Sequence, residues 1–188
     1  RLDMKTYKIQ TVKQPCEVIS GCDLSDNGST LVYYGSGACV APRLYSLNTK
    51  NQKVAEIGDI NKDMMAEIKI GTCEAWRFKS KNGYELTGHA YLPADLDPNK
   101  KYPMIVHYYG GCSPTSRRFG GGSHYPAHYW NALGYVVLIV NPGGASGFGQ
   151  EWGARHVNTA GEGIAEDIIE ATEWFTDTHK FVNKDRIG

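Results

Sequence analysis

The feature that most constrains the fold is an unbroken apolar run at residues 135–140, with the sequence YVVLIV. A strand that is covered on one face only alternates apolar and polar side chains, and this run has no polar position. Continuous runs rich in β-branched residues are typical of a parallel strand buried on both faces. The run is also far shorter than the roughly 20 apolar residues of a membrane-spanning helix. It therefore predicts a strand at the middle layer of an α/β domain.

Strands and helices alternate around this run. A strand is expected at residues 104–109, where MIVHYY continues into two glycines. An amphipathic helix is expected at residues 161–180, because apolar side chains recur there every three or four residues. Those side chains are Ile164, Ile168, Ala171 and Phe175. Another strand is expected to open at residues 186–188, so the order strand, helix, strand, helix, strand predicts a doubly wound α/β fold.

The long helix has a favourable charge distribution. Glu162, Glu166 and Asp167 lie in its first half, and His179 and Lys180 lie at its end. This polarity complements the helix dipole.

A shorter helix is expected between the two central strands, at residues 123–133. Ser123 is its predicted N-cap, and Pro126 is tolerated in the first turn. Its buried face is predicted to consist of Tyr129, Trp130 and Leu133.

The N-terminal part has a different texture, with short strands and tight polar turns. Strands are expected at residues 16–20, 30–34, 43–47 and 52–57. This pattern suits a propeller blade or a sandwich, and one blade cannot cover its own faces without neighbours. The pattern loosens after residue 58, so a domain boundary is predicted near residue 60. A further hairpin is expected at residues 74–92, with its turn at Asn82 and Gly83.

Charge and composition exclude several classes of protein. The chain has 20 basic and 20 acidic residues, so its formal net charge is zero. Nucleic-acid and anionic-membrane partners normally require a basic excess, and neither is expected. A hydrophobic share of 41% with 21% charged residues predicts a packed core rather than a disordered chain. The first 14 residues contain no apolar segment of the kind found in a signal peptide.

Metal and cofactor sites are not expected. The five cysteines show no C-x-x-C spacing, and their odd number leaves at least one unpaired, so scattered buried thiols are predicted. His124 and His128 have a helical spacing, but no acidic third ligand is near and zinc needs three or four ligands. Residues 141–149 hold four glycines without a phosphate-binding motif. That loop is predicted to need positive φ angles.

The strand that ends in Tyr108, Tyr109, Gly110 and Gly111 carries the clearest chemical signal. Ligands of open α/β sheets bind at the carboxyl ends of the strands, and glycines there allow close approach. A glycine-rich loop in this position also forms part of the oxyanion hole of many α/β hydrolases. Spacing alone favours the alternative, an ordinary tight turn without chemistry.

A nucleophilic serine is not found. No G-x-S-x-G occurs in the 188 residues. Ser146 is one residue short of that motif, and Ser36 and Ser123 also fail it.

Several segments resemble the prolyl oligopeptidase family of serine peptidases, which includes dipeptidyl peptidase IV-like and acylaminoacyl-peptidase-like enzymes. KYPMIVHYYGG at residues 101–111 is similar to the family's entry strand, and NPGGASGFG at 141–149 is similar to its N-x-R-G-S-x-G-Y-G loop. ALGY at 132–135, with the apolar run, resembles its LA-x-x-G-Y stretch. Residues 167–175 and 181–188 resemble the helix and strand that lead into the nucleophile elbow.

The resemblance implies the N-terminal half of an α/β-hydrolase domain at residues 61–188. It also implies that the β-rich segment at residues 1–60 is the last blade of a β-propeller. The family uses a Ser-Asp-His triad, in that chain order. Its serine would follow residue 188, so the chain is expected to be an inactive internal fragment. The later strands would then be missing, and an uncovered edge is expected on the run at 135–140 unless another chain or copy fills it.

One functional residue carries over from the family. Its oxyanion-hole tyrosine matches Tyr109, which precedes Gly110 and Gly111. Two positions depart from the family pattern: Cys112 stands where a proline often follows, and Gly143 replaces the arginine of the R-G pair.

The implied partners are a peptide substrate and the remainder of the same polypeptide, with no cofactor and no metal. Homo-oligomerisation of the parent is left open, and a periplasmic or secreted bacterial parent is suggested by family habit alone. Two alternatives remain. One is a non-catalytic family member that serves as a binding or interaction module. The other is an α/β-hydrolase esterase, against which the blade-like segment argues.

Overall fold

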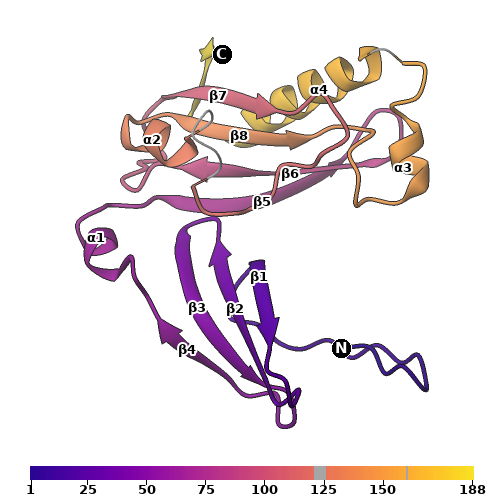
Figure 1. Cartoon of the computed structure of the whole chain (residues 1–188). Helices are drawn as coiled ribbons and strands as arrows, with labels where there is room; N and C mark the ends of the chain where they lie inside the picture. The colour runs from indigo at the N-terminus through magenta and orange to yellow at the C-terminus, as the bar shows by residue number, and fades with distance from the viewer. Residues whose placement is uncertain (121–125, 160) are drawn as a thin grey trace. The chain divides into compact units, whose positions relative to one another are not determined.

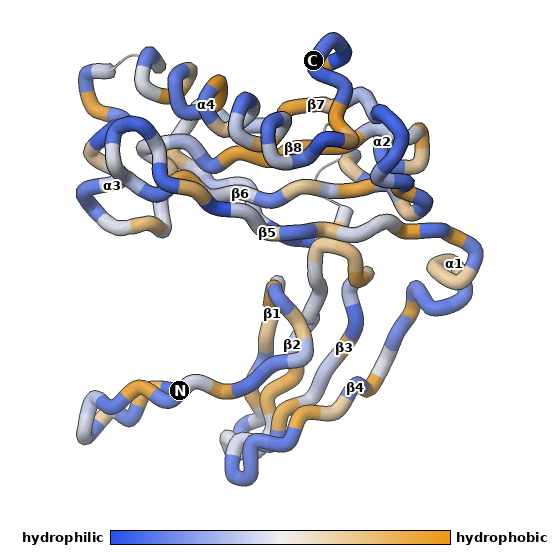
Figure 2. The backbone as a smooth tube through the Cα atoms, turned by 180° about the vertical axis from the view of Figure 1, so that it is seen from behind, coloured by the Kyte–Doolittle hydropathy of each residue, from blue (hydrophilic) through white to orange (hydrophobic). Residues whose placement is uncertain are grey.

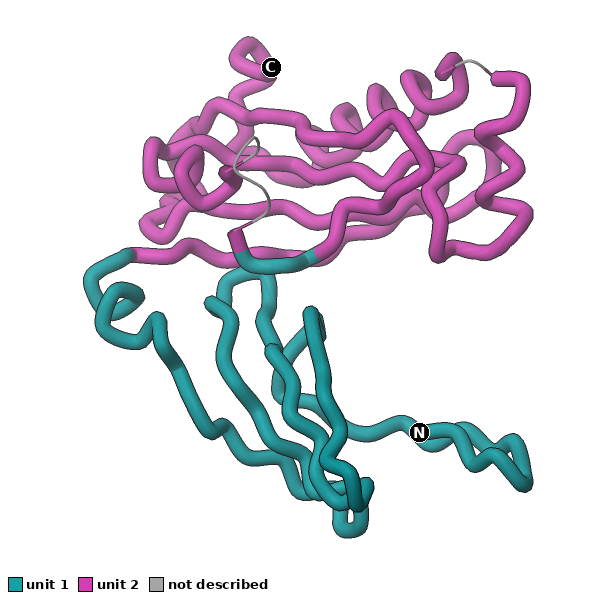
Figure 3. The backbone as a smooth tube through the Cα atoms, viewed as in Figure 1, with its two compact units in different colours: residues 1–68, 117–119 teal, residues 69–116, 120–188 magenta. Residues whose placement is uncertain are grey.

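The computed structural model describes residues 1–120, 126–159 and 161–188. It is a mixed α/β structure with two sheets (Figure 1). The chain divides into two compact units (Figure 3). Unit 1 consists of Arg1–Ile68 with Arg117–Phe119, and unit 2 consists of Lys69–Ser116 with Gly120–Gly188. The assignment of residues 1–60 to a propeller and of residues 61–188 to a hydrolase domain stays a prediction.

Unit 1 contains a four-stranded antiparallel sheet in the order β1-β2-β3-β4. The strands are β1 (Val18–Leu24), β2 (Thr30–Gly37), β3 (Val40–Asn48) and β4 (Val54–Gly58). They confirm the four expected strands, although β1 begins later and runs further than residues 16–20. The short helix α1 (Lys62–Ala66) follows and was not expected.

The core of unit 1 is small. Tyr33 stacks on Tyr45 with ring centroids 5.5 Å apart, and Leu47 packs beside them. Ile19, Leu24 and Ile57 stay about half exposed on the outer strands β1 and β4. The sheet therefore keeps apolar side chains that a neighbouring layer would cover.

Unit 2 contains a five-stranded mixed sheet in the order β5-β6-β8-β7-β9. The strands are β5 (Thr72–Lys79), β6 (Glu85–Leu92), β7 (Tyr102–Tyr108), β8 (Val136–Asn141) and β9 (Val182–Ile187). β7 runs parallel to β8 and β9, whereas β6 is antiparallel to both β5 and β8. The expected hairpin and the strand at 104–109 are confirmed, and β9 begins before the expected residue 186.

β8 is the hydrophobic strand in the middle of the sheet in Figure 2. It is buried at all six positions, which confirms the prediction from the apolar run. The prediction that one edge of this strand stays unpaired is wrong. β6 pairs with one side of β8 and β7 with the other, because the β5–β6 hairpin joins the same sheet. Its neighbours are therefore one parallel and one antiparallel strand.

Helix α4 (Glu162–Thr178) covers one face of this sheet. Ala171 and Phe175 are fully buried against Leu138, Val140 and Val182. Its apolar stripe is thus confirmed, with Ile164 buried and Ile168 partly buried. In the part of the chain that the structure describes, no helix has the length and apolarity needed to cross a membrane.

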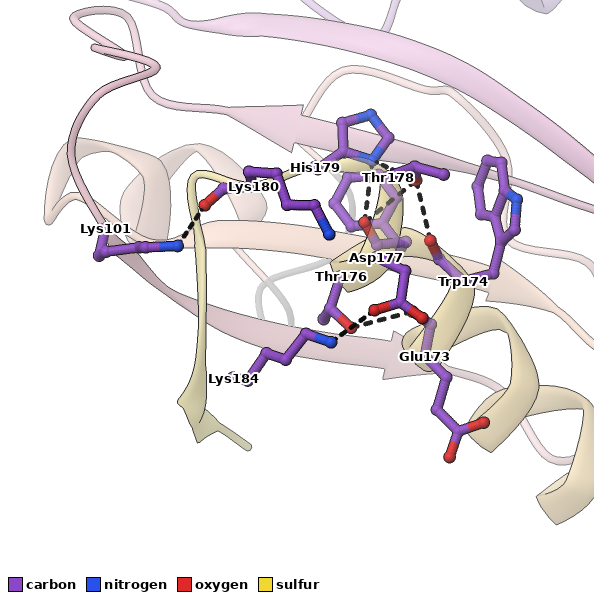
Figure 4. Close-up of polar contacts among 10 residues, drawn as sticks. Lys101, Glu173, Trp174, Thr176, Asp177, Thr178, His179, Lys180 and Lys184 are labelled. Carbon is purple, nitrogen blue, oxygen red and sulfur yellow. Dashed lines mark hydrogen bonds and ion pairs between the residues drawn. The ribbon is translucent and has the colours of Figure 1, made fainter.

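The C-terminal end of α4 is fixed by side chains (Figure 4). The His179 ring stacks on Phe175, and its Nδ1 donates to the Phe175 carbonyl oxygen at 3.0 Å. The Lys180 carbonyl oxygen accepts a hydrogen bond from Lys101 Nζ at 2.6 Å. The backbone N–H of Tyr102 donates to Phe181 at 2.7 Å, so the end of α4 is joined to the start of β7.

Helix α2 (Ala127–Ala132) is shorter than expected and faces differently. The predicted N-cap Ser123 lies outside the described residues. The predicted buried face is wrong at Tyr129 and Leu133, which are 58% and 55% exposed, whereas Trp130 is partly buried. The buried side chains are Ala127 and Asn131. The Asn131 amide group donates to the carbonyl oxygens of Tyr91 and Tyr135, and these bonds turn the polar side chain inward.

Candidate functional site

The carboxyl ends of β7 and β8 form one edge of the unit 2 sheet. The two strands are parallel, and Tyr108 pairs with Val140 near their ends (Figure 1). Tyr109 to Cys112 follow β7, and residues 142–149 follow β8, so both glycine-rich loops leave from this edge. Such an edge is where ligands bind in open α/β sheets.

Tyr109 lies in the first of these loops and is 56% exposed. Its ring lies over Gly111. A Cβ atom at position 111 would lie 2.5 Å from Tyr109 Cε1 and 3.1 Å from its hydroxyl oxygen. Gly111 does not have a positive φ, so glycine is needed there for space and not for backbone conformation. The absence of a side chain at 111 therefore lets the phenol occupy this place.

The two loops are joined by hydrogen bonds. The backbone N–H of Ser146 donates to the Cys112 carbonyl oxygen at 2.7 Å. The backbone N–H of Thr115 donates to the side chain of the buried Asn141 at 2.9 Å. A shift of the loop after β8 would therefore be transmitted to the loop that carries Tyr109.

The loop after β8 contains the positive φ angles that its sequence predicts. Gly144, Gly147 and Gly149 have φ values of 98°, 92° and 96°. Gly143 is the exception, because its φ lies outside the left-handed region. The helix that follows, α3 (Gln150–Ala154), was not expected from the sequence.

A polar cluster around the buried Asp167 contacts the loop after β8, and it was not predicted from the sequence. The Asp167 cluster consists of Tyr84, Gly143, Arg155 and Asp167. Asp167 is 1% exposed and accepts hydrogen bonds from the Gly143 backbone N–H at 2.7 Å and from the Tyr84 hydroxyl. Arg155 Nη2 lies 3.6 Å from the same carboxylate. Asp167 thus does more than complement the dipole of α4.

The sequence did hold a signal for this cluster. Asp167 falls on the apolar stripe of α4, three residues after Ile164 and four before Ala171. An acidic side chain on a buried stripe requires hydrogen-bond or charge partners.

The histidines pack against neighbouring groups. His107 is partly buried in β7, and burial lowers its pKa, so the ring is neutral at pH 7. His89 and His128 both lie edge-on to Tyr91, with ring centroids 5.5 Å and 5.2 Å away. His124, the other member of the predicted pair, lies outside the described residues. Within residues 1–120, 126–159 and 161–188, no group of His, Cys, Asp and Glu side chains could hold a metal ion.

All five cysteines are free thiols. The expectation that they are buried is wrong, because Cys22 and Cys112 are exposed and the other three are partly buried. Cys112 belongs to the loop after β7 that also carries Tyr109, and it is exposed.

Comparisons with known proteins identify the family. The family model described as "Prolyl oligopeptidase family" matches residues 123–188. Dipeptidyl-peptidase 5 of Porphyromonas gingivalis is 30% identical over 150 residues, which are 77% of this chain and 21% of that protein. Human dipeptidyl peptidase 8 is 30% identical over 117 residues, which are 61% of this chain and 13% of that protein. The chain belongs to the prolyl oligopeptidase family.

Solved structures of the family share the fold. An acylaminoacyl peptidase of Pyrococcus horikoshii superposes with a TM-score of 0.80 at 23% identity, over 95% of this chain and 28% of that one. A putative dipeptidyl aminopeptidase IV of Bacteroides ovatus superposes with a TM-score of 0.72 at 25% identity, over 91% of this chain and 24% of that one. The chain thus spans about a quarter or less of the length of the curated relatives.

The region matched by the family model contains β8, α4 and β9 together with the Asp167 cluster residues Gly143, Arg155 and Asp167. Tyr109 lies before this region. The oxyanion role expected for it from the sequence resemblance therefore stays a prediction.

Proposed function

We propose that this chain is part of a serine peptidase that hydrolyses short peptides through a Ser-Asp-His triad located beyond residue 188. The observation that carries the proposal is the placement of the Tyr109 phenol over Gly111 at the carboxyl edge of the sheet, in a member of a peptidase family. The chain has no G-x-S-x-G of its own. It is therefore proposed to supply one part of the active site and not the nucleophile.

In this proposal, unit 2 is the N-terminal half of an α/β-hydrolase domain and unit 1 is the last blade of a β-propeller. β7 is the third strand of the unit 2 sheet along the chain, and the loop after the third strand contributes to the oxyanion hole in α/β hydrolases. The exposed apolar side chains of β1 and β4 are consistent with a blade that packs against neighbours.

Tyr109 would stabilise the tetrahedral intermediate. When the serine oxygen attacks the scissile carbonyl, negative charge develops on the carbonyl oxygen. The Tyr109 hydroxyl would donate a hydrogen bond to that oxygen, with the backbone N–H after the serine as the second donor. More than half of the Tyr109 side chain is exposed, so a substrate can reach it.

The function is tested on the full-length protein, meaning the complete polypeptide that contains these 188 residues. We expect it to hydrolyse dipeptide p-nitroanilides or N-acetylated amino-acid p-nitroanilides, and to react with a fluorophosphonate probe at a serine. The isolated 188-residue chain is expected to do neither. Turnover by the isolated chain would contradict the placement of the triad. A full-length protein that binds peptides without probe labelling would be a binding module, and one that cleaves only simple esters would be an esterase.

A second prediction concerns Gly111. Gly111→Ala in the full-length protein should lower kcat by about 10-fold or more, because the new methyl group displaces the Tyr109 ring from its place and so removes an aligned donor. Stability should change little, since the displaced ring is exposed. Gly153→Ala is the matched control, because a Cβ there meets no atom within 4 Å. An unchanged kcat for Gly111→Ala, measured by steady-state kinetics, would show that the phenol is not used where the structure places it.

A further inference from the structure

Gly143 is glycine because another side chain fills its space. It is buried, and its backbone does not need the left-handed conformation. A Cβ atom at this position would lie 2.8 Å from Arg155 Cζ and 3.0 Å from both Arg155 Nη1 and Asp167 Oδ2. The guanidinium of Arg155 thus occupies the place that a side chain at 143 would enter. The arginine of the family's R-G pair is absent at this position, and an arginine from α3's C-cap stands beside it.

The Arg155 guanidinium packs against two aromatic rings next to Gly143. Its Cζ lies 3.3 Å from the centroid of the Tyr84 ring and 5.0 Å from that of Trp152. Its Nη2 lies 3.6 Å from Asp167 Oδ1, and its side chain is 27% exposed. A planar guanidinium can stack on an aromatic face and approach a carboxylate at the same time, which a lysine ammonium cannot do. The site is therefore built for arginine.

The Asp167 cluster is connected to the loop that carries Tyr109. Asp167 accepts from the Gly143 N–H, which fixes the start of the loop after β8. Further along the same loop, the Ser146 N–H donates to the Cys112 carbonyl oxygen, three residues beyond Tyr109. The first bond joins the Asp167 side chain to a backbone N–H and the second joins two backbone groups, so the Asp167 cluster and the two loops are connected.

We propose that Arg155 is a positioning residue, which fills the side-chain space of residue 143 and, with Asp167, holds the two loops in the arrangement that aims the Tyr109 hydroxyl. This inference rests on the proposed peptidase function. It assigns to Arg155 a role through Tyr109 and not a contact with substrate.

The first experiment measures whether Arg155 acts through Tyr109 in the full-length protein. Arg155→Ala should lower kcat by about 10-fold with KM nearly unchanged, and Arg155→Lys should not restore it. In a Tyr109→Phe background the same Arg155→Ala change should lower kcat by less than about 2-fold, because the donor is already lost. Equal losses in both backgrounds would overturn the proposal, since a merely structural role does not depend on Tyr109. Arg77→Ala, at an exposed position of β5, is the control.

The second experiment tests the shared space. Gly143→Ala alone should lower kcat of the full-length protein. The same change should lower kcat much less when Arg155 is also alanine, so the effects of the two changes on kcat should be non-additive by about 5-fold or more. Strict additivity would overturn the assignment of that space to Arg155.

A readout without catalysis separates this inference from the proposed function. In Arg155→Ala, the backbone amides of Gly143 and Ser146 should exchange hydrogen with solvent about 10-fold faster than in the unmodified full-length protein. Unchanged exchange at both amides would overturn the inference, whatever the activity. A protein that lacks peptidase activity but shows the faster exchange would refute the proposed function and leave the loop coupling supported.

Discussion

Replacing Tyr109 by phenylalanine is expected to lower kcat of the full-length protein by about 10²–10³, with little change in KM. The change removes only the hydroxyl group, so the ring can keep its place over Gly111. The lost hydrogen bond forms fully only when charge develops on the oxyanion. The loss should therefore fall on the chemical step and not on substrate binding.

Tyr108→Phe is the matched control for this experiment. Tyr108 is the last residue of β7 and is 48% exposed, close to the exposure of Tyr109. Tyr108 still belongs to β7, whereas Tyr109 lies in the loop with its ring over Gly111, so only the Tyr109 hydroxyl is expected to donate to the reacting carbonyl. An unchanged kcat for Tyr109→Phe, or an equal loss for Tyr108→Phe, would contradict the oxyanion role.

The largest effect on stability is expected for Asp167→Ala. Its carboxylate is fully buried and accepts hydrogen bonds from Gly143 and Tyr84 beside the Arg155 guanidinium. The change leaves the Gly143 N–H and the Tyr84 hydroxyl without their acceptor and the partly buried Arg155 guanidinium without its counter-charge, which together cost about 3 kcal/mol. For a domain of about 150–250 residues, this loss should lower the midpoint of thermal unfolding of the domain that contains Asp167 by roughly 10 °C.

Calorimetry of the full-length protein measures this change. Glu166→Ala is the control, because Glu166 is the exposed neighbour of Asp167 on the same helix. Its loss should shift the midpoint by no more than about 2 °C, since exposed charges contribute little. If both variants behave alike, the Asp167 cluster does not stabilise the domain as its contacts indicate.

Elements with a strong local pattern were predictable from the sequence. The apolar run at β8, the strand that precedes Gly110, the β5–β6 hairpin and the stripe of α4 all follow from periodicity within a few residues. The order of the strands was not predictable in this way. The pairing of β6 with β8 joins His89 to Ile139, and nothing near either residue specifies the other.

The candidate site was predictable in part for the same reason. Tyr109 and the two glycines after it form a local signal at a strand end. The Asp167 cluster combines side chains from the turn before β6, the end of α3 and the first half of α4 with a backbone N–H of the loop after β8. α3 has five residues and no apolar period, so its sequence gave no indication of a helix. The buried face of α2 was missed because the inward side chain is an asparagine that bonds to backbone carbonyls.

The strand order has a consequence for how the chain folds. β6 and β7 are neighbours along the chain, but in the finished sheet β8 lies between them. During synthesis both strands emerge before β8 exists, and a direct β6–β7 pairing would have to be undone. The other neighbour of β7 is β9, which is synthesised later still, since Tyr102 pairs with Val182, eighty residues further along the chain. Long-range pairings of this kind slow folding and leave strand edges open to other chains in the meantime. The sheet of unit 2 can therefore close only after nearly all of these 188 residues have left the ribosome.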